Sequence, residues 1–215
     1  MIKKRWKMMI LTSLVLLVPV VVGLLLWNQL PEQLPSHWDI NGNVDGWSEK
    51  TVAVFGFPGL LLGLHWICAL AASTDPKQSR YHIKSVVLIL WLCPVLGLVL
   101  STLMYSSALN LSLKIEVIMP LLMGLLFLVV GNLLPKCPQT YTVGIRLPWT
   151  LASEENWNKT HRFGGKIWVI GGLFIMATAF LGMFWILLVV LAVMAAAPTI
   201  YSYCYYRKHE KHTDC

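Results

Sequence analysis

The charged residues of this chain are separated by long intervals that contain no Asp, Glu, Lys or Arg. These intervals cover residues 8–31, 51–74, 85–113, 117–135 and 167–206. A bilayer core of about 30 Å requires roughly 20 helical residues. The first four intervals therefore predict one membrane-spanning helix each. The last is long enough for two helices, which we expect to be joined by a turn near Gly182.

The composition also indicates an integral membrane protein. Hydrophobic residues make up 57% of the chain and charged residues 13%, which lies outside the range of soluble globular proteins. The spans lack the period-two alternation of a closed barrel, so each must satisfy its backbone amides as a helix. We therefore predict an all-α membrane protein with a bundle of six transmembrane helices. The first span is longer than the apolar run of a signal peptide, and we expect it to be retained.

Lysine and arginine predict the orientation, because cytoplasmic segments retain positive charge during insertion. With the N-terminus inside, fifteen of the 17 basic residues lie in predicted cytoplasmic segments. Both termini are therefore predicted to be cytoplasmic. The predicted parts are 1–74, two spans with an exterior loop at 28–50; 75–135, the third and fourth spans; 136–166, a cytoplasmic loop with a short amphipathic helix; and 167–215, the last two spans and a basic tail.

The exterior loop is expected to form a compact hairpin-like cap, because Asn41-Gly42 and Asp45-Gly46 are strong turn signals. No metal is expected, since the loop lacks the bidentate glutamate of a calcium site. Four carboxylates and a single lysine make the loop suited to a cationic peptide. His37 and Trp38 allow two interpretations, either as contacts for an exterior ligand or, for the tryptophan, as an anchor at the lipid headgroups.

In the cytoplasmic loop, residues 141–147 are expected to be extended, and Pro148 is expected to bar a helix. Thr150 or Ser153 can cap a short helix that begins near Glu154, where acidic residues suit the helix dipole.

Within that short helix, Trp157 and His161 lie four residues apart and should share a face, while Arg162 lies on another. Gly164-Gly165 is expected to end the helix before the fifth span. We expect it to lie at the membrane surface or to form a lid beneath the bundle.

Arg146 stands close to Trp149, and a guanidinium can both fork onto a carboxylate and stack on an indole. It either binds an acidic group of a partner or pairs internally with Glu154 or Glu155. The sequence leaves both interpretations open.

Catalytic motifs are missing from the sequence, which contains no zinc-binding His-Glu-x-x-His, no nucleophile elbow and no phosphate-binding glycine loop. We therefore expect neither enzymatic activity nor a cofactor. The basic residues sit at the ends of spans, which favours anionic lipids over nucleic acid as their partner. His65 lies deep in a span, either as a hydrogen-bonded packing residue or as part of a polar path.

Two blocks of residues resemble the SdpI family of bacterial membrane proteins. The first is Gly144-Ile145-Arg146-Leu147-Pro148-Trp149-Thr150-Leu151 followed by Trp157, Thr160, His161 and Arg162, within residues 136–166, hereafter the signature segment. The second, Leu34-Pro35-Ser36-His37-Trp38 continuing through Gly42 and Asp45-Gly46 to Lys50, is similar to the module that usually precedes it.

The resemblance implies immunity to a secreted, membrane-active peptide toxin, and a role in which the occupied protein recruits a transcriptional repressor to its cytoplasmic face. The alternative is a small membrane transporter or channel, with His65 lining a path. The candidate residues for binding a ligand or partner are His37, Trp38, Asp45, Arg146, Trp149, Trp157, His161 and Arg162. The candidate turn residues are Gly42, Gly46, Pro148, Gly164 and Gly165.

Overall fold

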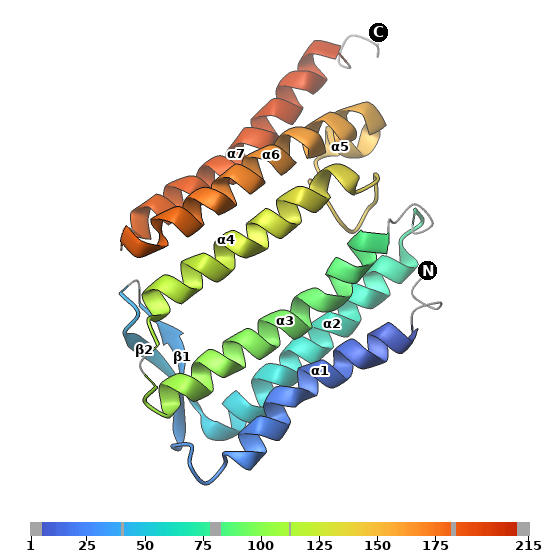
Figure 1. Ribbon diagram of the computed structural model, residues 1–215. Helices are drawn as coiled ribbons and strands as arrows, with labels where there is room; N and C mark the ends of the chain where they lie inside the picture. The colour runs from blue at the N-terminus through green and yellow to red at the C-terminus, as the bar shows by residue number, and fades with distance from the viewer. Residues whose placement is uncertain (1–5, 40, 78–82, 112, 182–183, 210–215) are drawn as a thin grey trace. The chain divides into compact units, whose positions relative to one another are not determined.

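The computed structural model describes residues 6–39, 41–77, 83–111, 113–181 and 184–209. Within these residues, six helices are long and apolar enough to cross a membrane. They are α1 (Trp6–Leu25), α2 (Phe57–Thr74), α3 (Ile83–Ala108), α4 (Ile115–Leu133), α6 (Glu154–Thr178) and α7 (Phe184–His209) (Figure 1). The prediction of a six-helix all-α membrane protein is confirmed. The turn expected near Gly182 lies outside the described residues, and the location of the termini stays a prediction.

Shorter elements connect these helices. A π-helical segment at Val52–Gly56 precedes α2, and 3-10 turns at Leu134–Lys136 and Ala179–Leu181 follow α4 and α6. The chain forms two compact units, one of Met1–Thr74 with Val86–Glu116 and the other of Asp75–Ser85 with Val117–Cys215. The four-part division made from the charges stays a prediction.

In the first unit, small residues bring the helices into close contact. A Cβ added to Gly23 of α1 would lie 2.8 Å from the Tyr105 hydroxyl, and one added to Gly97 of α3 would lie 2.9 Å from the buried Leu16 side chain. The Tyr105 hydroxyl also donates to the carbonyl of Pro19 at 3.0 Å. Close packing and interhelical hydrogen bonds of this kind drive helix association in lipid, where apolar burial alone provides little driving force.

An antiparallel hairpin of β1 (Gln33–Trp38) and β2 (Val44–Glu49) lies between α1 and α2. Its inner face is attached to the helices, because Leu34 is fully buried in a cluster with Met104 and Tyr105 of α3. The predicted hairpin-like form of this loop is confirmed.

The two glycines predicted as hairpin turn residues have different roles. Gly42 lies in the turn with a φ of +82°, a conformation that glycine adopts without strain. Gly46 lies inside β2, so its assignment to a turn is wrong. It is paired with His37, and a Cβ at Gly46 would lie only 2.7 Å from the His37 Cβ. The glycine therefore permits close strand pairing.

In the second unit, a short helix α5 (Pro148–Ala152) precedes α6. The expectation that Pro148 bars a helix is wrong, because proline at the first helical position loses only an N–H that has no partner there. The predicted start of the next helix at Glu154 is confirmed. Ser153 is its N-cap and accepts the N–H of Asn156 at 3.2 Å.

Helix α6 carries two glycine pairs, Gly164-Gly165 and Gly171-Gly172, seven residues apart. The second glycine of each pair faces α4. A Cβ at Gly165 would lie 2.7 Å from the Gly131 carbonyl oxygen, and one at Gly172 would lie 2.6 Å from the Gly124 carbonyl oxygen. Both crossings therefore require glycine on each helix.

The first glycine of each pair faces α7. A Cβ at Gly164 would lie 3.3 Å from the Pro198 ring, and one at Gly171 would collide with the Met194 sulfur. The prediction that Gly164-Gly165 ends the helix is therefore wrong, and so is the short surface helix built on it. The glycines admit neighbouring helices on both sides, and α6 runs through them without a break.

Candidate functional site

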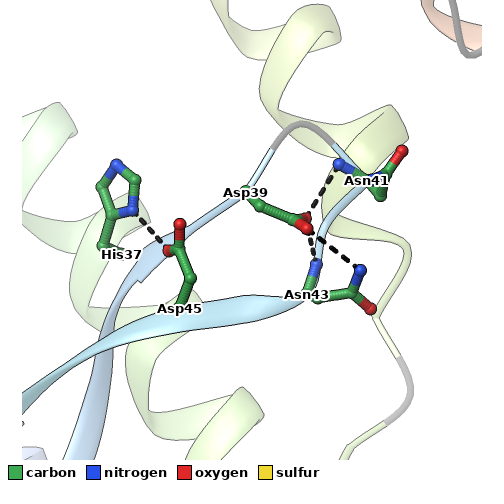
Figure 2. A network of polar contacts seen from close by, with 5 residues as sticks. All are labelled: His37, Asp39, Asn41, Asn43 and Asp45. Atoms are coloured by element: carbon green, nitrogen blue, oxygen red, sulfur yellow. Dashed lines mark hydrogen bonds and ion pairs between the residues drawn. The ribbon is translucent and has the colours of Figure 1, made fainter.

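The hairpin carries a histidine–aspartate pair at its surface. His37 Nδ1 lies 2.5 Å from Asp45 Oδ1, and the two side chains are 71% and 48% exposed. Beside them, Asp39 accepts the backbone N–H groups of Asn41 and Asn43 at 2.9 and 2.8 Å (Figure 2). Hydrogen bonds, led by that from the Asn43 side chain, lower the pKa of Asp39. Among the described residues, no group of three or more His, Cys, Asp or Glu side chains could hold a metal ion.

Trp38 is directed inward. It packs against the cluster that contains Leu34 and Tyr105, and its indole N–H is buried with no hydrogen-bond partner among the described residues. Trp38 therefore attaches the hairpin to the helices. Trp47, which is not among the predicted site residues, is 57% exposed and is the accessible indole of β2.

The base of the hairpin is closed by Lys50, which is only 7% exposed. Its Nζ donates to the Glu32 carboxylate at 3.0 Å and lies 5.1 Å from the centre of the Trp27 ring. The lysine of the predicted exterior loop is thus withdrawn from the surface, while the Glu32 side chain is 92% exposed. The exposed charge of the hairpin is therefore negative.

Trp157 and His161 form the buried centre of the signature segment. Their rings stack with centroids 4.1 Å apart, which confirms their shared face. Trp157 donates its indole N–H to the Cys137 carbonyl at 2.9 Å. His161 Nε2 accepts the N–H of Ile145 at 2.9 Å, so Nδ1 carries the proton and donates to the Trp157 carbonyl at 2.8 Å. Gly144, at a φ of +129°, leaves room for both rings.

Trp149 connects α5 to α7. Its indole N–H donates to the Ser202 hydroxyl at 2.7 Å, and its ring stacks on Tyr206. Ser202 in turn donates to the Asn156 side-chain oxygen at 2.9 Å, which also accepts from Thr160 at 3.0 Å. This buried polar network holds three helices together, so Trp149 has a structural role in addition to any contact it makes.

Asp75 is not among the predicted site residues, yet it holds the signature segment in place. Its side chain is 3% exposed, and its carboxylate accepts hydrogen bonds from the N–H groups of Lys77, Tyr141 and Thr142 and from the Thr142 hydroxyl, at 2.7–3.0 Å. Lys77 adds a bond from its Nζ to the Gln139 side chain at 2.5 Å. The sequence signal is an Asp-Pro turn directly after a span, but it does not reveal the partner.

Arg146 and Arg162 are the exposed members of the predicted cytoplasmic site. Arg146 donates to the Tyr141 carbonyl at 2.7 Å, which holds its guanidinium beside the loop. One of its proposed internal partners, Glu155, instead pairs with Lys159 at 2.9 Å. The aromatic residues of the signature segment thus support the fold, and the two arginines are exposed.

His65 is fully buried in α2, with its Nε2 3.1 Å from the Thr12 hydroxyl of α1. Its Nδ1 is also buried and has no partner among the described residues. The bond to α1 supports the interpretation of His65 as a packing residue between two helices.

Comparisons with known proteins relate both polar segments to described families. Residues 136–202 match the SdpI/YfhL protein family, and residues 14–62 match a domain of unknown function, DUF1648. The chain is also 28% identical to the Immunity protein SdpI of Bacillus subtilis (strain 168) over 206 residues, which are 93% of this chain and 96% of that relative. No solved structure matches the chain.

Proposed function

We propose that the chain is an immunity protein that protects its cell against a secreted, membrane-active peptide toxin, because its residues 136–202 match the SdpI/YfhL protein family. The chain is a multi-pass plasma-membrane protein whose described residues include six helices apolar enough to cross a bilayer. Membrane-active toxins act at the same membrane. Its similarity to an immunity protein over nearly the whole length of both chains supports this role. We propose that it acts by binding and not by catalysis.

The observation that carries the proposal is the presence of two polar structures separated by an odd number of spans. The hairpin follows α1, and the signature segment follows α4, so α2, α3 and α4 lie between them. Three membrane crossings would put the two structures on opposite faces. In the orientation favoured by the basic residues, the hairpin is exterior and the signature segment cytoplasmic.

In this arrangement, the exposed His37 and Asp45 of the hairpin are the proposed contacts for the toxin. Arg146 and Arg162 are the proposed contacts for an acidic group on a cytoplasmic transcriptional repressor, which the occupied protein would recruit. The basic residues near the span ends bind anionic lipid headgroups, each contributing about 1 kcal/mol.

A survival assay tests the function. The chain is expressed in a bacterium that lacks its own immunity, and the cells are exposed to a panel of membrane-active peptide toxins. We expect survival to rise with expression for at least one toxin. The double substitution of His37→Ala with Asp45→Asn should reduce that survival, whereas Gln33→Ala, on the same hairpin, should not.

Membrane fractions must contain equal amounts of each variant, so that lost protection reflects lost binding. Protection against none of the toxins by protein present in the membrane contradicts the immunity function. Solute movement by the reconstituted protein, without protection, favours the transporter alternative.

A further inference from the structure

The residue pair at the base of the hairpin determines which opposed pairs of its strands are hydrogen-bonded and which are not. The N–H of Lys50 donates to the carbonyl of Glu32 at 2.9 Å, so these residues form a bonded pair. The same register continues through Gln33 with Glu49, Leu34 with Ser48, and Pro35 with Trp47. Opposed residues of antiparallel strands alternate between bonded and non-bonded pairs. The residues whose backbone groups point away from the partner strand are therefore Gln33, Pro35, Trp47 and Glu49.

The two edges of the hairpin differ in their ability to pair with another strand. On the β1 edge, Pro35 has no N–H to offer, which is a common protection of exposed strands. On the β2 edge, Trp47 and Glu49 keep both N–H and C=O groups. Neither makes a backbone hydrogen bond to another element in the part of the chain that the structure describes. The β2 edge is therefore the one open to strand addition.

The side chains beside this open edge are acidic and aromatic. The exposed positions of β2 are Asp45, Trp47 and Glu49, which alternate with half-buried residues. The exposed Glu32 carboxylate stands near the same end, while the positive charge of Lys50 is buried beneath the hairpin. This charge distribution complements a basic peptide, and an exposed indole also attracts cationic side chains.

We propose that the β2 edge binds an extended, cationic peptide segment by strand addition. Backbone hydrogen bonds to Trp47 and Glu49 provide the pairing, and the carboxylates select basic side chains at alternate positions. This inference rests on the proposed function in identifying the natural ligand as the toxin. The binding mode itself can be tested independently on the purified protein.

The probe is a short fluorescent peptide of alternating lysine and valine, whose affinity for the full chain in lipid nanodiscs is measured by anisotropy. Glu49→Pro removes an outward N–H from the β2 edge, and Gln33→Pro removes the equivalent group from the β1 edge as the matched control. We expect the first to weaken binding about tenfold or more and the second by less than about twofold. Glu49→Gln removes the charge but keeps the backbone N–H, so the affinity for the peptide should fall less than in Glu49→Pro and should depend less on salt than in wild type.

A second measurement needs no protein variant. The same peptide, N-methylated at alternate residues, retains its charge but loses the donors for strand pairing. We expect it to bind wild-type protein about tenfold more weakly. Equal binding of the methylated and unmethylated peptides, or equal effects of Glu49→Pro and Gln33→Pro, overturns strand addition.

The survival assay separates this inference from the proposed function. If wild type and Glu49→Pro protect cells equally, the edge is not the toxin site and immunity stands. If the peptide binds as expected but wild type protects against nothing, the edge proposal stands as a peptide site and the immunity function fails.

Discussion

Replacement of Asp75 by alanine should release the signature segment from the turn after α2. The carboxylate accepts bonds from three backbone N–H groups and one hydroxyl and is 3% exposed. Each buried donor that loses its partner costs about 1–3 kcal/mol. Because Tyr141 is 48% exposed, water can replace part of the loss, and we expect a total of about 3 kcal/mol. For a protein of this size, that corresponds to a Tm decrease of about 6–12 °C.

Thermal unfolding in detergent measures this change, and limited trypsin digestion locates it. Cleavage after the exposed Arg146 should become faster in Asp75→Ala than in wild type. Asp75→Asn should show an intermediate effect, because its amide oxygen can still accept from Tyr141 and Thr142 while its NH₂ group opposes the Lys77 N–H.

Asp39→Ala is the matched control. Asp39 also accepts backbone N–H groups, from Asn41 and Asn43, but at the surface, where water can replace it. We expect little change in Tm and none in cleavage after Arg146. A Tm for Asp75→Ala within experimental error of wild type, with unchanged trypsin cleavage, would refute the assignment of Asp75 as the residue that holds the signature segment.

Three further outcomes are expected. Gly165→Leu should prevent folding, because its Cβ would lie 2.7 Å from a backbone carbonyl, whereas Gly63→Leu, with nothing within 4 Å, should leave expression and Tm unchanged. Hydrogen bonds lower the pKa of Asp39 below its ordinary value of 3.8, so the ionised carboxylate stabilises the hairpin above that pH, and the stabilisation should be lost as the pH falls through the lowered pKa. An NMR titration of the hairpin measures the midpoint for Asp39, and a midpoint at or above 3.8 would contradict the prediction. Burial raises the pKa of the Cys137 thiol and Cys204 is exposed, so maleimide should label Cys204 much faster than Cys137 when single-cysteine variants are compared in detergent. Equal labelling rates for the two cysteines would contradict the packing of the signature segment.

The spans could be predicted from the sequence because their boundaries depend on charge, which is a local property of the residues. The hairpin could also be predicted, since Asn41-Gly42 specifies a turn by its own conformational preference. The start of α6 at Glu154 follows from a similar local signal, the serine cap before it. Each of these features is determined by residues that are close in sequence.

The errors have the opposite origin. A glycine pair ends a helix in isolation, but Gly164-Gly165 lies between two neighbouring helices, and that contact is not encoded locally. Asp75 could not be paired with Tyr141 for the same reason, as 66 residues separate them. Trp157 and His161 were correctly placed on one face, yet only the structure shows that this face is buried.

The seven-residue spacing of the glycine pairs in α6 restricts how the length of this helix can change. A single inserted residue between the pairs would rotate one pair relative to the other by about 100°. Gly171 would then take the place of Gly172 against α4, and Ile170 would replace glycine against Met194 of α7, although every backbone bond of the helix would remain intact. Insertions and deletions in this stretch should therefore be tolerated far less than in the loops, and natural length variation among homologues should avoid residues 165–171 unless it occurs in steps of two full turns.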